Sequence, residues 1–369
     1  MFFQGRLFMI IESLKLENFR NISRAELHFD SDAVFFEGGN GQGKTSLLEA
    51  VFYVANLRSF RTLKINELKK LGCLSFHLSL SFLKKQGWKS QLEVDCGQVR
   101  TLQADRVPVS KASDFTGKIK TIAFLPDDPL IISGPSLLRR RFFDMFISLL
   151  DRSYFMDLQN YLQALRSRNI LLKNHNCNLD ILRSYSTVLA SSGSEIIRKR
   201  AKYVELICSL MKHLFEELCP SLSDFSIQMD FTKETADPDS YLKKSEKDLK
   251  RDLQRGFTAF GPHLDDFEFL FDGKSMRFFG SRGQCRMASL ILKLAELDAV
   301  RQISGALNDT VVLVDDATAD LDLHARQAFS EKIRTAGQVF FAFTEIPPEF
   351  DLEKSDHFKV RSGEVERSN

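Results

Sequence analysis

Residues 38–46 read GGNGQGKTS, and this short segment constrains the fold more than any other part of the 369-residue chain. It matches the pattern GxxxxGK(S/T), in which glycines let successive backbone N–H groups turn inward around phosphates without Cβ clashes. An apolar run at 33–36 precedes it and a helical pattern at 46–57 follows it. A phosphate loop requires this strand-to-helix context. A plain glycine-rich turn is the simpler alternative, and the flanking elements argue against it.

The expected nucleotide contacts follow from this pattern. Lys44 can reach the β- and γ-phosphates, and the Thr45 hydroxyl can ligate Mg²⁺. The segment is therefore predicted to hold a nucleotide through Gly38, Gly39, Asn40, Gly41, Gln42, Gly43, Lys44, Thr45 and Ser46.

A second apolar run, at 311–314, ends in two carboxylates, Asp315 and Asp316. Asp315 would hold Mg²⁺ together with Thr45. Asp316 would lie where an attacking water could be polarised, which makes it the predicted catalytic residue. Many strands end in two aspartates, so the signal is weak alone and becomes strong beside a phosphate loop.

A third segment, Gly280-Ser281-Arg282-Gly283-Gln284, opens a helical pattern that continues to residue 303. A glycine-flanked serine at a helix start can bind an anion, so Ser281, Gly283 and Gln284 join the predicted nucleotide contacts. Ser281 could instead simply cap the helix. One nucleotide does not need two phosphate-binding helix ends from one chain, whereas two chains arranged head to tail could each lend one.

Composition narrows the class of protein. The chain has 51 Lys and Arg against 49 Asp and Glu, a net charge of +2, so a polyanion would have to bind to local basic patches. No apolar run approaches the roughly 18 residues of a membrane helix, and the first residues do not form a signal peptide. The cysteines are scattered without a CxxC pair, which favours reduced thiols. We therefore expect a cytoplasmic protein with no membrane partner.

The expected architecture is α/β, with a P-loop ATPase lobe interrupted by a helical lobe. Strand and helix signals of the ATPase lobe cover 9–125 and 257–369, and helical patterns dominate 126–256. Residues 1–8 are predicted to be an N-terminal extension. No sustained heptads appear, so no long coiled coil is expected.

The order of these motifs is similar to that of an ABC-type ATPase head, and the chain resembles the RecF family of bacterial recombination mediators, which are related to the SMC proteins. The supporting segments are LKLENFRN (14–21), GGNGQGKTSLLEA (38–50), LRSFRT (57–62), GPSLLRRRFFD (134–144), YLQALRSRNILLK (161–173), GPHLDD (261–266), GSRGQ (280–284) and ADLD (319–322). The resemblance implies ATP and Mg²⁺ as cofactors and an ATP-dependent homodimer. It also implies binding to gapped DNA or single-/double-strand junctions, and RecO- and RecR-type partners in the loading of RecA.

At two positions the sequence differs from typical ABC-type ATPases in a way that affects the expected rate of ATP hydrolysis. Asp316 stands where ABC-type ATPases usually have glutamate, and Thr344 falls near the position of the switch histidine of transporters. Both favour slow, DNA-stimulated hydrolysis that serves as a switch. Pro126-Asp127-Asp128 is the segment expected to correspond to the metal-side loop of ABC-type heads.

Several arginines could contact DNA phosphates. In SMC-like heads the arginines that correspond to Arg58 and Arg61 lie near phosphate or DNA, and the helical lobe carries Arg139, Arg140 and Arg141 in a row. Such contacts would be sequence-independent and salt-sensitive. Solvated arginines on turns and helix faces are the alternative.

Three other functions remain open at this point. An ATP-gated DNA clamp without useful turnover differs from a slow ATPase only in phosphate release. The nucleotide-binding subunit of an ABC transporter is disfavoured by the long helical insert and by Thr344. A nuclease of the ATPase-plus-carboxylate type would need a second catalytic domain.

Overall fold

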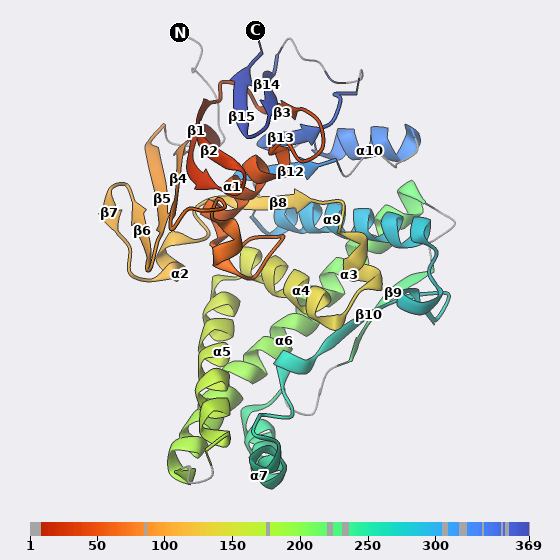
Figure 1. The fold of residues 1–369 in the computed structure, drawn as a ribbon. Coiled ribbons are helices and arrows are strands. Elements are labelled where there is room, and N and C mark those ends of the chain that lie inside the picture. Colours follow the sequence, from red (N-terminus) through yellow and green to blue (C-terminus); the bar gives the residue numbers. More distant parts are fainter. Residues whose placement is uncertain are drawn as a thin grey trace. The chain divides into compact units, whose positions relative to one another are not determined.

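The computed structural model describes residues 9–84, 87–174, 178–219, 224–230, 236–304, 309–316, 323–333, 336–347, 350 and 354–368. The chain divides into two compact units (Figure 1). The first comprises Met1–Pro126 and Ser304–Asn369, and the second comprises Asp127–Ile303.

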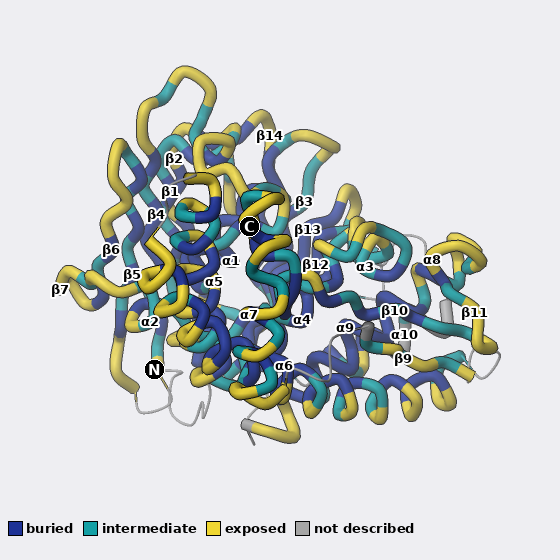
Figure 2. The backbone as a smooth tube through the Cα atoms, turned by 90° about the horizontal axis from the view of Figure 1, so that it is seen from below, coloured by how far each residue is buried: buried dark blue, intermediate teal, exposed yellow. Residues whose placement is uncertain are grey.

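A six-stranded sheet with a parallel core forms the centre of the first unit, in the order β15-β14-β3-β13-β12-β8. The strands are β3 (Ala33–Glu37), β8 (Lys120–Phe124), β12 (Thr310–Asp315), β13 (Gln338–Phe343), β14 (Asp356–Arg361) and β15 (Glu364–Arg367). Only β15 runs antiparallel to its neighbour. Strands β12 and β13 are buried at every position, as continuous apolar runs in a parallel sheet should be (Figure 2). Parallel strands share a carboxyl edge, so the loop after β3 and the end of β12 lie at the same edge.

The second sheet of this unit is antiparallel, in the order β2-β1-β4-β5-β6-β7. Its strands are β1 (Ile10–Phe19), β2 (Ile22–His28), β4 (Phe76–Leu83), β5 (Lys89–Cys96), β6 (Arg100–Ala104) and β7 (Val107–Pro108). Apolar residues alternate with polar ones along β4, and Phe76, Leu78, Leu80 and Phe82 are all buried on one face.

Helix α1 (Lys44–Asn56) contacts strands of both sheets. This position explains why it is apolar nearly all round and buried from Leu47 to Ala55. The helix ends at Leu57, which adopts the left-handed conformation with φ 53°. The smaller elements of the unit are η1 (Ile65–Leu68), α2 (Ala112–Phe115) and α10 (Leu323–Ile333).

The second unit is mainly helical. It contains α3 (Pro129–Ser133), α4 (Ser136–Leu150), α5 (Arg152–Leu172), α6 (Leu179–Leu218), α7 (Pro238–Arg255), η4 (Pro262–Leu264), α8 (Met276–Phe279) and α9 (Arg282–Ser304). Helices α5 and α6 pack side by side (Figure 1). A small antiparallel sheet, β11-β10-β9, completes it, with β9 (Phe225–Asp230), β10 (Asp266–Phe271) and β11 (Lys274–Ser275).

The boundary of this unit differs from the one expected from the sequence. The segment 257–303, assigned there to the ATPase lobe, clusters with the helical unit. The physical reason is strand pairing, because β10 pairs antiparallel with β9 from Asp266 to Phe271. Strand β9 itself gave no recognisable signal between two long helical patterns.

A buried polar cluster holds the GPHLDD segment inside the second unit. Arg200 is 1% exposed and donates to Asp144 Oδ1 (2.7 Å), Asp265 Oδ2 (2.6 Å), the Pro262 carbonyl (2.6 Å) and the Tyr154 hydroxyl (3.0 Å). A buried guanidinium is tolerated only when its donors are paired in this way. The GPHLDD segment is therefore a structural part of the second unit.

Candidate nucleotide-binding site

The phosphate loop connects β3 to α1 in a conformation that needs glycine. Gly41 and Gly43 have φ values of 74° and 124°, in the range that side chains other than glycine rarely adopt. A Cβ on Gly38 would lie 2.2 Å from the carbonyl oxygen of Val360. No side chain caps the N-terminus of α1 at Gly43. The first turn of α1 therefore presents its N–H groups and the positive end of its dipole to the loop.

Hydrogen bonds of Asn21 and Gln42 tie the phosphate loop to neighbouring turns. Asn21, in the turn after β1, donates to the Gln42 carbonyl (2.9 Å) and accepts from the Ser46 hydroxyl (3.0 Å). The Gln42 Oε1 accepts from the Ser362 N–H (2.5 Å), and the Gly363 N–H donates to the Gln42 carbonyl (2.8 Å). Gln42, predicted to contact the nucleotide, thus also anchors the loop to the β14–β15 turn. The role of Asn21 had no signal of its own, because its partners follow it by more than 20 positions.

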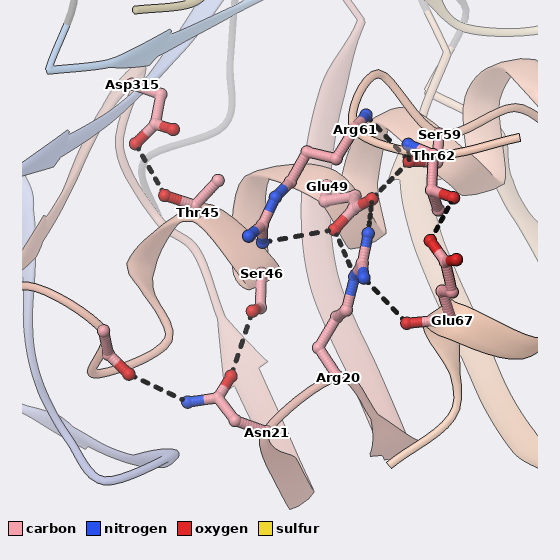
Figure 3. A network of polar contacts seen from close by, with 11 residues as sticks. Arg20, Asn21, Thr45, Ser46, Glu49, Ser59, Arg61, Thr62, Glu67 and Asp315 are labelled. Carbon is pink, nitrogen blue, oxygen red and sulfur yellow. Dashed lines mark hydrogen bonds and ion pairs between the residues drawn. The ribbon is translucent and has the colours of Figure 1, made fainter. Parts of the chain in front are cut away.

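The polar groups predicted from the sequence, Lys44, Thr45 and Asp315, contact the phosphate loop or one another. The ammonium of Lys44 donates to the carbonyls of Gly38 (2.7 Å) and Gly39 (2.9 Å). The Thr45 hydroxyl donates to Asp315 Oδ1 at 2.9 Å (Figure 3). Burial lowers the pKa of Lys44, although Asp315 and Asp316 oppose the shift. Burial raises the pKa of Asp315, against the Thr45 hydrogen bond and the charge of Lys44. Burial thus disfavours the charged forms of both residues. Bound phosphates would stabilise the Lys44 ammonium, and a bound cation would stabilise the Asp315 carboxylate.

These groups line one cavity of about 740 Å³, a volume suited to a nucleotide. Six phosphate-loop residues share its wall with Asp315 and Asp316, namely Asn40, Gly41, Gly43, Lys44, Thr45 and Ser46. Asp316 follows the end of β12 with φ 48°, and its N–H donates to the Ala342 carbonyl (3.0 Å). The structure therefore brings together the predicted metal ligands, the predicted catalytic residue and six of the twelve predicted nucleotide contacts.

Arg61 also lines this cavity, and its side chain is 49% exposed. Arg58 is half-buried and does not line it. The sequence paired the two arginines, but only Arg61 reaches the site. Behind Arg61, a network centred on Glu49 connects α1 to Arg20 and Ser59 (Figure 3).

The second unit carries the three predicted nucleotide contacts at the start of α9. Ser281 and Gln284 form a reciprocal capping box at the start of α9: the Gln284 N–H donates to Ser281 Oγ (3.2 Å), and the Ser281 N–H donates to Gln284 Oε1 (2.8 Å). Gly283 has open space where a Cβ would lie. The capping alternative is thus realised, and it leaves both residues and Gly283 exposed or half-buried at a helix N-terminus. The motif 319–322 lies outside the described residues.

The three consecutive arginines of α4 do not form one surface. Arg139 is 2% exposed, and it binds Asp266 through two bonds of 2.7 and 2.9 Å and the Gly134 carbonyl at 2.6 Å. The expectation that Arg139 contacts DNA is incompatible with this burial. Arg140 is half-buried and donates to the Asp265 carbonyl (2.7 Å), and Arg141 is half-buried.

Two kinds of feature are absent from the described residues. These residues include no helix that is both long and apolar enough to cross a membrane. They also hold no group of three or more His, Cys, Asp or Glu side chains that could bind a metal ion.

Comparison with known proteins agrees with this geometry. Residues 9–260 match the family model of an AAA ATPase domain. The DNA replication and repair protein RecF of Ruminiclostridium cellulolyticum is 30% identical over 371 residues, which cover 97% of this chain and 99% of the relative. The RecF of Leptospira interrogans is 32% identical over 367 residues, with the same coverage.

Solved structures give the same result. The recombination mediator protein RecF-ATP of the RecFOR pathway matches with a TM-score of 0.88 and 27% identity over 100% of both chains. The Smc head domain of Pyrococcus furiosus, at 15% identity and a TM-score of 0.53 over 98% of this chain and 96% of that one, shares the fold alone. The fold is thus that of an ABC-type ATPase head, as the sequence predicted, and the chain belongs to the RecF family.

Proposed function

We propose that this protein is an ATP-dependent DNA-binding protein of recombinational repair and replication restart. One observation carries the proposal: a single cavity joins the phosphate loop, Thr45 and the two carboxylates that end β12. The names of its relatives, DNA replication and repair protein RecF and recombination mediator protein RecF-ATP, support the biological setting.

The residues of the cavity fit ATP and Mg²⁺. The uncapped N-terminus of α1 and Lys44 would bind the phosphates. The Thr45 hydroxyl and Asp315 Oδ1, 2.9 Å apart, are oxygen ligands of the kind Mg²⁺ prefers, and phosphate oxygens and water would complete its shell. Bound Mg²⁺ would neutralise phosphate charge. Asp316 would accept a hydrogen bond from the attacking water and orient it.

The wider proposal concerns partners. By family, ATP would close a homodimer in which Ser281, Gly283 and Gln284 of one chain face the nucleotide held by the other. The dimer would bind gapped DNA or single-/double-strand junctions in the cytoplasm and, with RecO- and RecR-type partners, promote RecA loading. The RecFOR pathway to which the matched structure belongs supports these partners.

Calorimetric titration of MgATP into the unaltered protein and Lys44→Ala tests the core of the proposal. Lys44 is 7% exposed, and its ammonium is desolvated, so its removal should spare the fold. We expect ATP affinity to fall at least about 30-fold, because a desolvated charge–phosphate pair is lost. Lys89→Ala, at the exposed start of β5, should bind ATP normally. Equal ATP affinity for all three proteins would overturn the proposal. Fluorescence anisotropy of labelled gapped DNA with and without ATP then tests DNA binding.

A second candidate function is an ATP-gated DNA clamp without useful turnover. It is favoured by Asp316, whose carboxylate is one methylene shorter than the glutamate usual in ABC-type ATPases. Phosphate release with and without DNA separates the two, because a switch ATPase should release phosphate faster on DNA and a clamp should release none.

A further inference from the structure

Glu49 lies on α1 one turn after Thr45, and it is 0% exposed. Its carboxylate accepts two bonds from Arg20, from Nε (2.8 Å) and from Nη2 (2.7 Å), and one from the Ser59 hydroxyl. A buried carboxylate is costly unless it is paired and hydrogen-bonded. This one therefore ties the phosphate-loop helix firmly to two other segments.

The groups that bind Glu49 also hold the segment 59–68. Ser59 Oγ accepts from the N–H groups of Arg61 and Thr62, both at 2.9 Å. At the other end, Arg20 donates from Nη1 to the Glu67 carbonyl (2.7 Å), and its N–H donates to the Leu68 carbonyl (2.8 Å). Figure 3 shows Arg20, Ser59 and Arg61 converging on the Glu49 carboxylate. Both ends of the segment are thus anchored through partners of Glu49.

Arg61 is the loosely held member of this network. Its Nη1 lies 3.8 Å from Glu49 Oε2, beyond hydrogen-bond distance, while three shorter bonds already occupy the carboxylate. Its side chain lines the nucleotide cavity together with Lys44 and Asp315. A polyphosphate carries more negative charge than one shared carboxylate, so it would draw this guanidinium away from Glu49.

We propose that Glu49 is a positioning residue of the nucleotide site, which holds Arg61 at the cavity wall for transfer to a phosphate of the bound nucleotide. Glu49 does not line the cavity, so it would not touch the bound nucleotide. It acts through Ser59, which orients the backbone at Arg61, and through Arg20, which fixes the far end of the segment. The inference rests on the proposed binding of ATP to this cavity.

A double-mutant cycle on ATP affinity tests it. Glu49→Gln keeps the shape and an acceptor for Ser59 but loses the charge that holds Arg20 and attracts Arg61. We expect Glu49→Gln and Arg61→Ala each to weaken MgATP binding by about ten-fold, and the double variant to be no weaker than the worse single variant. Such coupling is expected only if both side chains act through one contact.

Two further variants keep the test decisive. Asp356→Asn is the matched control, because Asp356 is also a buried carboxylate (1% exposed) paired with an arginine, Arg367, but lies outside the cavity. It should lose stability like Glu49→Gln and bind ATP as the unaltered protein does. If Glu49→Gln fails to fold, Ser59→Ala replaces it in the cycle, since it removes the hydroxyl that joins Glu49 to the backbone of Arg61.

The outcomes separate this inference from the proposed function. Additive losses in the double variant, or an equal loss in Asp356→Asn, would show that Glu49 is only structural. Absence of ATP binding by the unaltered protein would overturn the proposed function and this inference with it. Normal binding by the unaltered protein and additive losses would overturn only the inference.

Discussion

Asp315 destabilises the free protein at neutral pH because burial disfavours its charged form. It is 7% exposed, and burial raises its pKa above the ordinary value of 3.8. The folded state therefore binds the proton more tightly than the unfolded state. Stability falls as pH rises from about 4 through the raised folded pKa, and the full cost is present above it.

Asp315→Asn should separate stability from function. We expect the variant to be more stable than the parent at pH 7.5, with the difference shrinking as the pH is lowered toward 4. The Asn oxygen can still accept from Thr45, so the local geometry should persist. Mg²⁺-dependent ATP binding should nevertheless fall, because a metal ligand has lost its charge. Denaturant unfolding and titration with and without Mg²⁺ give the two readouts, and a variant less stable at pH 7.5 would contradict the argument.

Sequence patterns identified residues whose role is local, and they missed those whose partners are distant. The phosphate loop, Asp315 and Asp316 follow from spacing, and the structure brings them together. Glu49 could have been noticed as the one charge in the apolar run of α1, but its arginine and serine partners come from other segments. Arg139 was mistaken for a surface residue because three consecutive helical positions span about 200°, so they cannot share one exposed face.

At the scale of elements, periodicity predicted the strands and helices but not which unit they join. Continuous apolar runs of the sequence form strands β3, β12 and β13 in the structure, and a run with alternating apolar residues forms β4. The affiliation of 257–303 depends on pairing between β9 and β10 and on the buried partners of GPHLDD, which no periodic pattern encodes.

His263, in that segment, should make the second unit sensitive to acid. With its ring neutral, His263 accepts at Nδ1 from the Tyr161 hydroxyl (2.7 Å) and donates from Nε2 to the Thr258 carbonyl (3.1 Å). Burial, with nearby arginines, lowers its pKa from 6.5 to about 4. The unfolded state therefore takes up a proton first, and stability is lost as pH falls from about 6.5 to about 4, by up to about 3 kcal/mol.

His263→Gln should remove most of this acid sensitivity, because the amide can keep both hydrogen bonds without titrating. Calorimetric unfolding of the full chain between pH 7.5 and 4.5 should show a smaller decrease in the melting temperature than in the parent. His28→Gln, at an exposed position of β2, should behave as the parent does. Parallel pH profiles for His263→Gln and the parent would rule out this account.

At the scale of the whole molecule, each unit supplies one half of the composite nucleotide site expected in the proposed ATP-dependent dimer. The first carries the phosphate loop, and the second carries Ser281 at the start of α9. The two-fold arrangement proposed above would place each Ser281 at the γ-phosphate of the partner's ATP. Because Ser281 is also a helix cap, a substitution must preserve the cap if it is to test the dimer.

Ser281→Asp meets that condition. Aspartate caps a helix about as well as serine does, so the Gln284 N–H keeps its acceptor and the fold should be unchanged. The added negative charge would face the partner's γ-phosphate, and like charges in a closed interface repel by several kcal/mol. We therefore expect light scattering to show an ATP-dependent dimer for the parent and a monomer for Ser281→Asp, which should still bind ATP. Ser281→Ala, which loses the cap but adds no charge, should dimerise more than Ser281→Asp does.

Mixing Ser281→Asp with Lys44→Ala extends the test to the composite site. Neither variant should dimerise alone. Ser281→Asp repels the nucleotide bound to the partner chain, and Lys44→Ala cannot bind a nucleotide in its own phosphate loop. A mixed dimer contains one intact site, formed by Lys44 of the Ser281→Asp chain and Ser281 of the Lys44→Ala chain. ATP should therefore restore dimers in the mixture, and ADP, which lacks the γ-phosphate, should not. If Ser281→Asp forms dimers by itself with ATP, Ser281 only caps α9 and the facing arrangement is wrong.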